Sequence, residues 1–186
     1  MRLVEERDGV DERDTVVEGL RQDYWRTLGE DEDDGSPRPA LLQVLVFCLG
    51  TRRFALATAE CRHVVRVPVV VPLPGVARHV EGIINLRGRI TSVTDLAALM
   101  GVGRFGASEQ RRLIVAAAGE AVTALDVDRV EKILDLDMAS IRPPGAVGAP
   151  SFVVGETVVD CEPVVVLSVP RLMACPAMAV DVRRNE

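Results

Sequence analysis

The chain has 186 residues, of which 48% are hydrophobic and 27% charged, with a formal net charge of −6. This length accommodates one domain or two small ones, and the apolar fraction excludes wholesale disorder. Aromatic residues make up only 3%, so the core must be aliphatic, and a binder of single-stranded nucleic acid, which needs aromatic stacking platforms, is disfavoured.

The acidic charge is concentrated near the N-terminus. Residues 1–40 hold 13 acidic residues and 6 arginines, a net charge of −7, which leaves 15 acidic and 16 basic residues in the remainder. The nearly neutral body disfavours duplex DNA and anionic membranes as partners. No apolar run reaches the length of a membrane span, and the first residues lack the apolar segment of a signal peptide. We therefore expect a cytoplasmic protein that does not insert into the membrane.

One segment of this acidic extension has helical periodicity. Val17, Leu20, Tyr24 and Leu28 are spaced three and four residues apart, which places them on one helix face. The acidic run 30–34, closed by Gly, Ser and Pro, predicts a solvated linker. We expect the helix to pack on the body, and a docking helix for a partner is the alternative.

Residues 41–173 predict an all-β body. Short runs of β-branched and other apolar residues are separated by Gly, Pro and polar turns, which predicts about ten strands. The runs are 42–49, 54–56, 64–67, 80–86, 89–94, 113–118, 121–127, 130–134, 157–159 and 164–167. Arg87-Gly88 predicts a tight hairpin turn, and Asp95 predicts the cap of a short helix over 96–100. Residues 174–186 show no clear pattern and are expected to form a tail.

An internal repeat organises the β-rich body. A shift of 69 residues places Cys61 on Val130, and a shift of 73 residues places Gly82 on Gly155. The repeat predicts two similar units of about five strands, and five short twisted strands close naturally into a small barrel. Two such barrels in tandem would form a groove, and grooves between domains are common binding sites.

The hairpin region also carries a family resemblance. The run Val80-Glu81-Gly82-Ile83-Ile84-Asn85-Leu86-Arg87-Gly88-Arg89-Ile90, followed by Val93-Thr94-Asp95-Leu96, resembles the signature of the CheW-like family of chemotaxis coupling proteins. Residues 72–75 (Pro-Leu-Pro-Gly) and 127–134 resemble further parts of the same family, so the similarity covers roughly residues 42–173.

The resemblance implies an all-β fold of two tandem five-stranded SH3-like barrels packed around a hydrophobic groove. It also implies a non-enzymatic adaptor, without cofactor or metal, that joins the cytoplasmic tip of chemoreceptors to the regulatory domain of a CheA-like histidine kinase. The same domain occurs in related pathways. The alternative is therefore a CheW-like scaffold or regulator of a different kinase pathway, in motility or development, that does not contact receptors.

The resemblance also suggests a receptor-binding groove. Its candidate residues are Cys61, His63, Val64, Asn85, Arg87 and Val130. Arg87, at the hairpin tip, can pair with carboxylates or carbonyls of a receptor, whereas Asn85 can hold the turn instead of contacting a partner. His63 stands where the family usually has a Glu that pairs with the motif arginine, so Arg87 is expected to lack its usual internal partner. No residue is assigned to kinase binding.

Other kinds of site have weaker support. Cys61 and His63 are two residues apart, so on a regular strand they would face the same way, but no third group completes a catalytic set. Asp126 and Asp128 are spaced likewise and are expected on a solvated face. Cysteines 48, 61, 161 and 175 form no close pair, which predicts buried or half-buried free thiols and no zinc site. A small-barrel nucleic-acid binder is a third class, which retention on heparin would reveal.

Overall fold

The computed structural model describes residues 40–104, 109–145 and 148–178. The predicted N-terminal helix and linker lie outside these residues. The strands are β1 (Leu41–Leu49), β2 (Arg52–Ala57), β3 (Cys61–Arg66), β4 (Val80–Leu86), β5 (Arg89–Asp95), β6 (Arg112–Ala118), β7 (Ala121–Val127), β8 (Arg129–Asp137), β9 (Val153–Val159) and β10 (Glu162–Leu167). The helices are η1 (Thr58–Glu60), α2 (Leu96–Met100), η2 (Met138–Ser140), α3 (Val169–Ala174) and η3 (Pro176–Met178).

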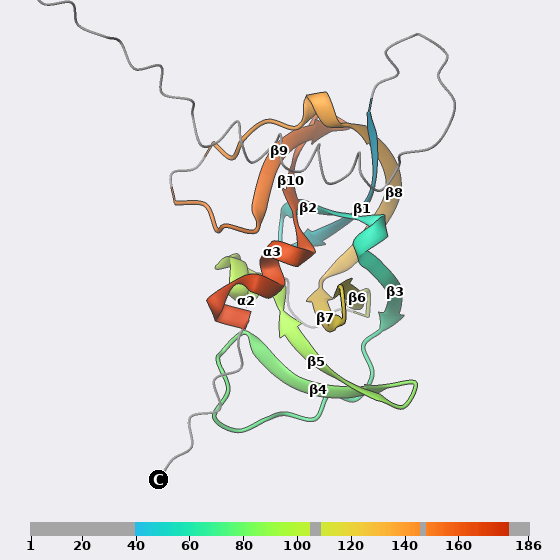
Figure 1. The fold of residues 1–186 in the computed structure, drawn as a ribbon, viewed down its shortest axis with the longest axis vertical. Coiled ribbons are helices and arrows are strands. Elements are labelled where there is room, and N and C mark those ends of the chain that lie inside the picture. The colour runs from blue at the N-terminus through green and yellow to red at the C-terminus, as the bar shows by residue number, and fades with distance from the viewer. Residues whose placement is uncertain (1–39, 105–108, 146–147, 179–186) are drawn as a thin grey trace, which may run out of the picture. The chain divides into compact units, whose positions relative to one another are not determined.

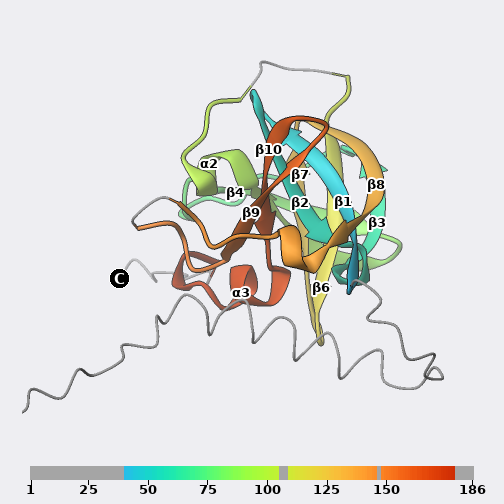
Figure 2. The same ribbon diagram turned by 90° about the horizontal axis from the view of Figure 1, so that it is seen from above.

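The ten strands form two five-stranded sheets, as the sequence predicted. One has the order β8-β1-β2-β10-β9 and is called barrel 1 below. The other has the order β3-β6-β7-β5-β4 and is called barrel 2. Figure 1 shows barrel 1 in its upper half and barrel 2 in its lower half, and Figure 2 shows β1 between its two partners, β2 and β8.

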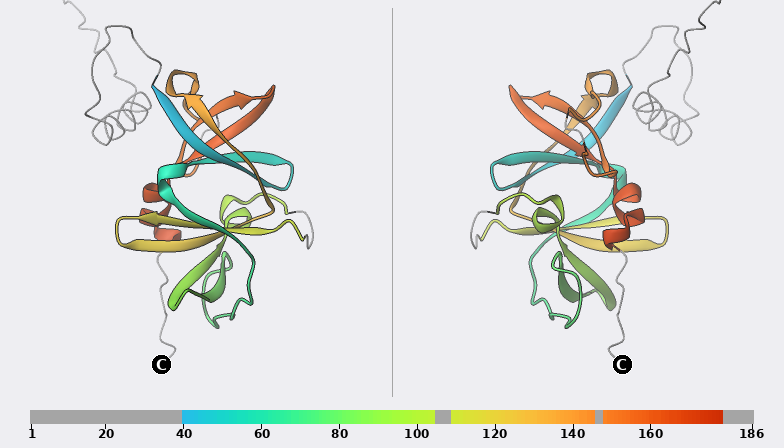
Figure 3. Two further views of the ribbon diagram at one scale, coloured as in Figure 1. Left: turned by 90° about the vertical axis from the view of Figure 1, so that its right-hand side faces the viewer. Right: turned by 90° about the vertical axis from the view of Figure 1, so that its left-hand side faces the viewer.

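The two barrels exchange strands, so neither is a continuous stretch of chain. Barrel 1 takes β1 and β2 from the first repeat and β8 to β10 from the second, whereas barrel 2 takes β3 to β5 from the first and β6 and β7 from the second. The chain crosses from β2 into β3 through η1, which Figure 3 shows between the two barrels. The tandem arrangement expected from the repeat is corrected in this respect. The repeat gives the order of the strands but does not say which strands pair.

The same offsets that relate the sequence relate the pairing of the strands. Phe47 pairs with Val130 between β1 and β8, and Ala116 pairs with Cys61 between β6 and β3. Each residue of the second pair lies 69 positions from its counterpart in the first. Offsets of 69 and 73 residues likewise relate the parallel pairing of β2 with β10 to that of β7 with β5. Equivalent positions in the two barrels can therefore be compared side chain by side chain.

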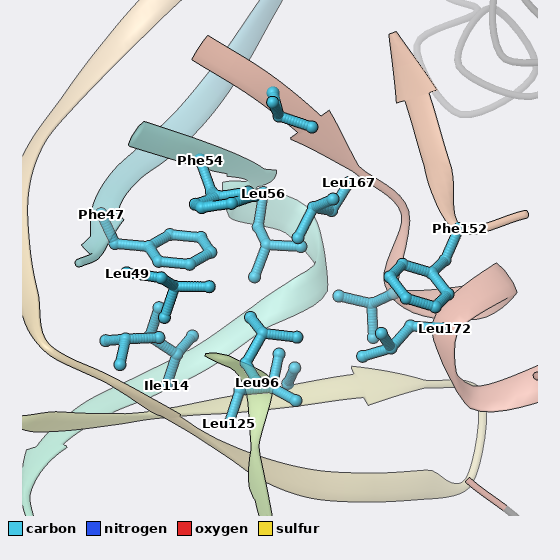
Figure 4. Packing of buried hydrophobic residues seen from close by; sticks show 14 of the residues in the cluster. Phe47, Leu49, Phe54, Leu56, Leu96, Ile114, Leu125, Phe152, Leu167 and Leu172 are labelled. Atoms are coloured by element: carbon cyan, nitrogen blue, oxygen red, sulfur yellow. The ribbon is translucent and has the colours of Figure 1, made fainter. Parts of the chain in front are cut away.

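One apolar core joins the two barrels and both α-helices (Figure 4). Its fully buried side chains come from β1, β2, α2, β6 and β7, and include Phe47, Phe54, Leu96, Ile114 and Leu125. Burying each side chain of this size contributes about 1.5–3 kcal/mol. The barrels are thus held together by shared packing as well as by shared strands.

The helix caps and two close backbone approaches follow from short sequence signals. Asp95 accepts a hydrogen bond from Ala98 N at 3.0 Å and begins α2, as predicted, and Ser168 does the same for α3 at the equivalent position. A Cβ at Gly82 would collide with the Val71 carbonyl oxygen, and one at Gly155 would lie 2.6 Å from the Arg142 carbonyl oxygen. Both glycines are therefore required by backbone geometry.

The predicted tail is described as far as Met178, and this part packs on the body. Met173, Cys175 and Met178 contact the shared core. The Ala177 carbonyl oxygen lies 2.6 Å from Nε2 of His79, in the loop that precedes β4. A short amphipathic segment after a helix has no clear period, so its docking gives no signal in the sequence.

Candidate functional site

The β4–β5 hairpin presents Arg87 at a tight two-residue turn. Leu86 pairs with Arg89, and the intervening Arg87 and Gly88 have φ angles of 52° and 85°. Positive φ at both central residues defines the turn that matches the twist of the strands. The exposed Asn85 accepts a hydrogen bond from Gly88 N at 2.8 Å through Oδ1. Its side chain therefore stabilises the turn, one of the two roles considered for it.

A pocket of about 360 Å³ lies beside this hairpin, on barrel 2. Its polar lining is basic and comprises Arg62, His63, Arg87 and Arg89, with Glu120 as the acidic member. Its apolar lining includes Leu86, Ile90, Val115 and Val122. The pocket therefore combines positive charge with an apolar floor, a combination suited to an acidic segment that also carries apolar side chains.

A β-bulge brings two neighbouring residues of β3 to the pocket. Cys61 pairs with Ala116 and His63 with Val115, so Arg62 is an extra residue in β3. Both Arg62 and His63 line the pocket. The bulge interrupts the alternation of faces, and the expectation that Cys61 and His63 face the same way is wrong.

The basic groups of the pocket have few internal partners. Arg62 Nη2 donates to the Gly119 carbonyl oxygen at 3.5 Å. Within the described part of the chain, His63, Arg87 and Arg89 make no ion pair, and no hydrogen bond ties them to a neighbour. Arg87 thus lacks an internal carboxylate, in agreement with the presence of His63 where the family usually has Glu.

The remaining candidate residues lie outside this pocket. Cys61 and Val130 are half-buried and pack against the core that joins the barrels, at equivalent positions of the repeat. Val64 is 42% exposed on β3. The structure therefore brings His63 and Arg87 together in the pocket, and places the apolar pair Cys61 and Val130 at the junction of the barrels. Sequence reasoning missed Arg62 and Arg89, because a bulge and a hairpin register decide which faces they occupy.

The thiol of Cys61 is not a nucleophile in this setting. Its Sγ donates to the Ala57 carbonyl oxygen at 3.4 Å. Burial, with a smaller contribution from the charge of Glu60, raises the pKa of Cys61 to about 12. The thiolate is the reactive form, and this pKa keeps the thiol protonated at neutral pH.

The four cysteines are not joined in disulfides. Cys48 is buried and Cys61 and Cys175 are half-buried, but Cys161 is exposed, contrary to expectation. It occupies the tip of the β9–β10 hairpin, at the position equivalent to Gly88. In the described ranges, no group of three or more His, Cys, Asp or Glu side chains is arranged to hold a metal ion.

The carboxylates of Asp126 and Asp128 are buried, so the prediction of a solvated face was wrong. Asp126 has no exposed surface and Asp128 is 5% exposed. Arg104 and Arg111 reach them from the two ends of the β5–β6 connection, where Arg104 Nε donates to Asp128 Oδ1 at 3.2 Å and Arg111 pairs with Asp126. Distant arginines in a loop carry no periodic signal, which is why alternation alone misplaced these side chains.

A fold of two SH3-like barrels with an open basic pocket is the framework to which known proteins can be compared. The family model of the CheW-like domain matches residues 43–175, and the chain belongs to this family. A solved structure, that of the scaffolding protein TtCheW from Thermoanaerobacter tengcongensis, is similar with a TM-score of 0.67 at 29% sequence identity, covering 75% of this chain and 91% of that one.

Relatives of known name are similar over part of their length. The chemotaxis protein CheW of Thermotoga maritima is 33% identical over 92 residues, which are 50% of this chain and 60% of that protein. The protein PilI of Pseudomonas aeruginosa is 33% identical over 84 residues, 45% of this chain and 47% of PilI. The chain thus spans about half to three fifths of the length of these two relatives. In the described residues, no helix has the length and apolar character needed to cross a membrane.

Proposed function

We propose that this protein is a non-enzymatic adaptor that couples chemoreceptors to a CheA-type histidine kinase, in chemotaxis or a chemotaxis-like pathway. It would act in the cytoplasm, at receptor arrays. The observation that carries the proposal is the family match over residues 43–175, on a fold whose open surface feature is a binding pocket. The scaffolding role in the printed name of the similar TtCheW structure supports it.

The receptor tip would bind at the pocket beside the β4–β5 hairpin. His63 and Arg87 line it, and the exposed Arg87 is held at the tip by the turn that Asn85 stabilises. Cys61, Val64 and Val130 would supply apolar contact along the junction of the barrels to a helical receptor segment. The kinase regulatory domain would bind a different face, so that both partners are held at once.

Two relatives favour a second candidate function. PilI of Pseudomonas aeruginosa and FrzA of Myxococcus xanthus, the latter 26% identical over 98 residues, carry names other than chemotaxis protein. The second candidate is a CheW-like scaffold of a different kinase pathway, in motility or development. Such a protein would bind a kinase but no receptor.

The test is calorimetry with two purified partners from the source cell, a kinase regulatory domain and a receptor tip fragment. Arg87→Glu should weaken receptor binding by about 1–3 kcal/mol, the range of a lost charged contact, and leave kinase binding unchanged. Arg66→Glu is the matched control, because Arg66 is also exposed on β3 but does not line the pocket. Kinase binding without receptor binding would favour the second candidate, and absence of both would refute the adaptor role.

A further inference from the structure

The basic pocket of barrel 2 has an equivalent face on barrel 1, and the two faces carry opposite charges. The offsets of 69 and 73 residues define the equivalent positions. The corresponding pairs are Arg62 and Glu131, Arg87 and Asp160, Arg89 and Glu162, and Val122 and Arg53. Three arginines of barrel 2 thus correspond to three carboxylates of barrel 1, and a valine corresponds to an arginine.

On barrel 1 the chain itself neutralises these charges. Arg53 Nε lies 3.0 Å from Glu131 Oε2 and 3.2 Å from Glu162 Oε2, so one guanidinium bridges two carboxylates. Lys132 pairs with Asp160 at the hairpin tip. The charged groups of this face are therefore satisfied without a partner.

On barrel 2 the bridging group is absent. Val122, the counterpart of Arg53, is a short half-buried side chain that carries no charge, and it lines the pocket together with Arg62 and Arg89. Since the registers are the same, Arg62 and Arg89 flank Val122 as Glu131 and Glu162 flank Arg53. The space over Val122 is part of the pocket.

We propose that this space receives one carboxylate side chain of the partner, seated over Val122 between Arg62 and Arg89. The arrangement is the charge-inverted copy of the bridge made by Arg53 on barrel 1. Arginine pairs well with carboxylates because its fork of N–H donors matches the two oxygens. The proposal rests on the proposed function for the partner's identity, a helical segment of the receptor tip.

The apolar lining sets a second requirement on that segment. Ile90 is 76% exposed and lies at the pocket with Leu86 and Val115. A segment that places an Asp or Glu beside an apolar residue on one helix face would satisfy the arginines and cover Ile90 together. A segment with Gln at the acidic position would leave both arginines unpaired.

The first test uses the chain as its own ligand. Val122→Glu places a carboxylate over the site, and Val122→Gln and Val122→Arg are the neutral and the repulsive counterparts of similar length. In thermal melts of the full chain we expect the Val122→Glu variant to melt about 2–4 °C above the Val122→Gln variant, and the Val122→Arg variant below both. The difference should shrink in high salt. A Val122→Glu variant that melts at or below Val122→Gln would overturn the proposal.

The second test measures binding of a defined probe. A helical peptide with one Glu beside Leu residues, and its Gln counterpart, are titrated against the labelled full chain by fluorescence anisotropy. The Glu peptide should bind about tenfold more tightly, a difference of about 1.4 kcal/mol. Arg89→Gln and Val122→Glu should both remove that preference, while Arg66→Gln should keep it.

Three results would overturn the proposal. They are equal binding of the two peptides, displacement of the Glu peptide by inorganic phosphate at the same concentration, and a dimer of the full chain that Val122→Glu dissociates, which would make a second copy the occupant. If the peptide preference and the melts behave as expected but the receptor tip fragment does not bind, the proposed function fails and the carboxylate site stands.

Discussion

Replacing Arg104 with Met should be among the most damaging single changes to barrel 2. The Arg104 guanidinium lies 2.8 Å from Asp126 Oδ2, 3.0 Å from both Glu81 Oε1 and Asp95 Oδ2, and 3.2 Å from Asp128 Oδ1. These carboxylates come from β4, the end of β5, β7 and the start of β8. One loop arginine thus neutralises charges that would otherwise repel one another inside the barrel.

The magnitude follows from the burial of the carboxylates. Removing one partner of a buried ion pair costs about 3–5 kcal/mol, because the remaining charge is left in a poorly solvated site. Asp126 keeps Arg111, and Asp128 keeps a hydrogen bond from Gly50 N at 2.6 Å. We therefore expect Arg104→Met to lower the free energy of unfolding by about 3 kcal/mol, with Arg104→Lys between the two because it keeps the charge but loses the fork.

The assay is urea unfolding of the full chain, followed by far-ultraviolet circular dichroism. The only Trp lies at position 25, outside the described residues, so fluorescence would not report on the barrels. Arg66→Met is the matched control, since Arg66 is exposed on β3 and makes no ion pair in the described part of the chain. A loss no larger than that of the control, at an unchanged m-value, would refute the reasoning.

Two further predictions concern stability. Burial raises the pKa of Glu60 from 4.5 to about 7. Because the folded pKa exceeds the ordinary value, stability should fall as pH rises from about 4.5 to 7, and Glu60→Gln, which keeps an acceptor for Val169 N, should be more stable than wild type by about 2–3 kcal/mol at pH 8 but equal to it near pH 4; a pH-independent difference would contradict this. Gly155→Ala should destabilise by about 1–3 kcal/mol because its Cβ would meet the Arg142 carbonyl oxygen, whereas Gly103→Ala, in open space, should not, and matching chemical melts of the two would contradict the geometry.

Much of the fold could be predicted because its signals are local. The strands 80–86 and 121–127 have the bounds predicted from their β-branched runs. The turn at Arg87-Gly88 and the cap at Asp95 follow from the chemistry of those residues. Each of these features depends on a few consecutive side chains, which is the range over which a sequence pattern carries information.

The candidate site was predicted only in part because its geometry depends on pairing. His63 and Arg87 do line one pocket, but Arg62 joins them through a bulge that strand alternation cannot reveal. Asp126 looked solvated by alternation and is buried against arginines from a loop. The exchange of strands between barrels has the same origin, since it is decided by contacts between segments far apart in the chain.

The exchange of strands bears on how such a chain can arise. A single repeat supplies two strands to one barrel and three to the other, so alone it completes neither. Two identical copies would complete both, as a symmetric, strand-swapped homodimer. Fusing the copies into one chain removes the requirement that their surfaces be identical. The arginines of one half and the carboxylates of the other are the kind of divergence that only a fused pair allows, with one face closed upon itself and the other open to a partner.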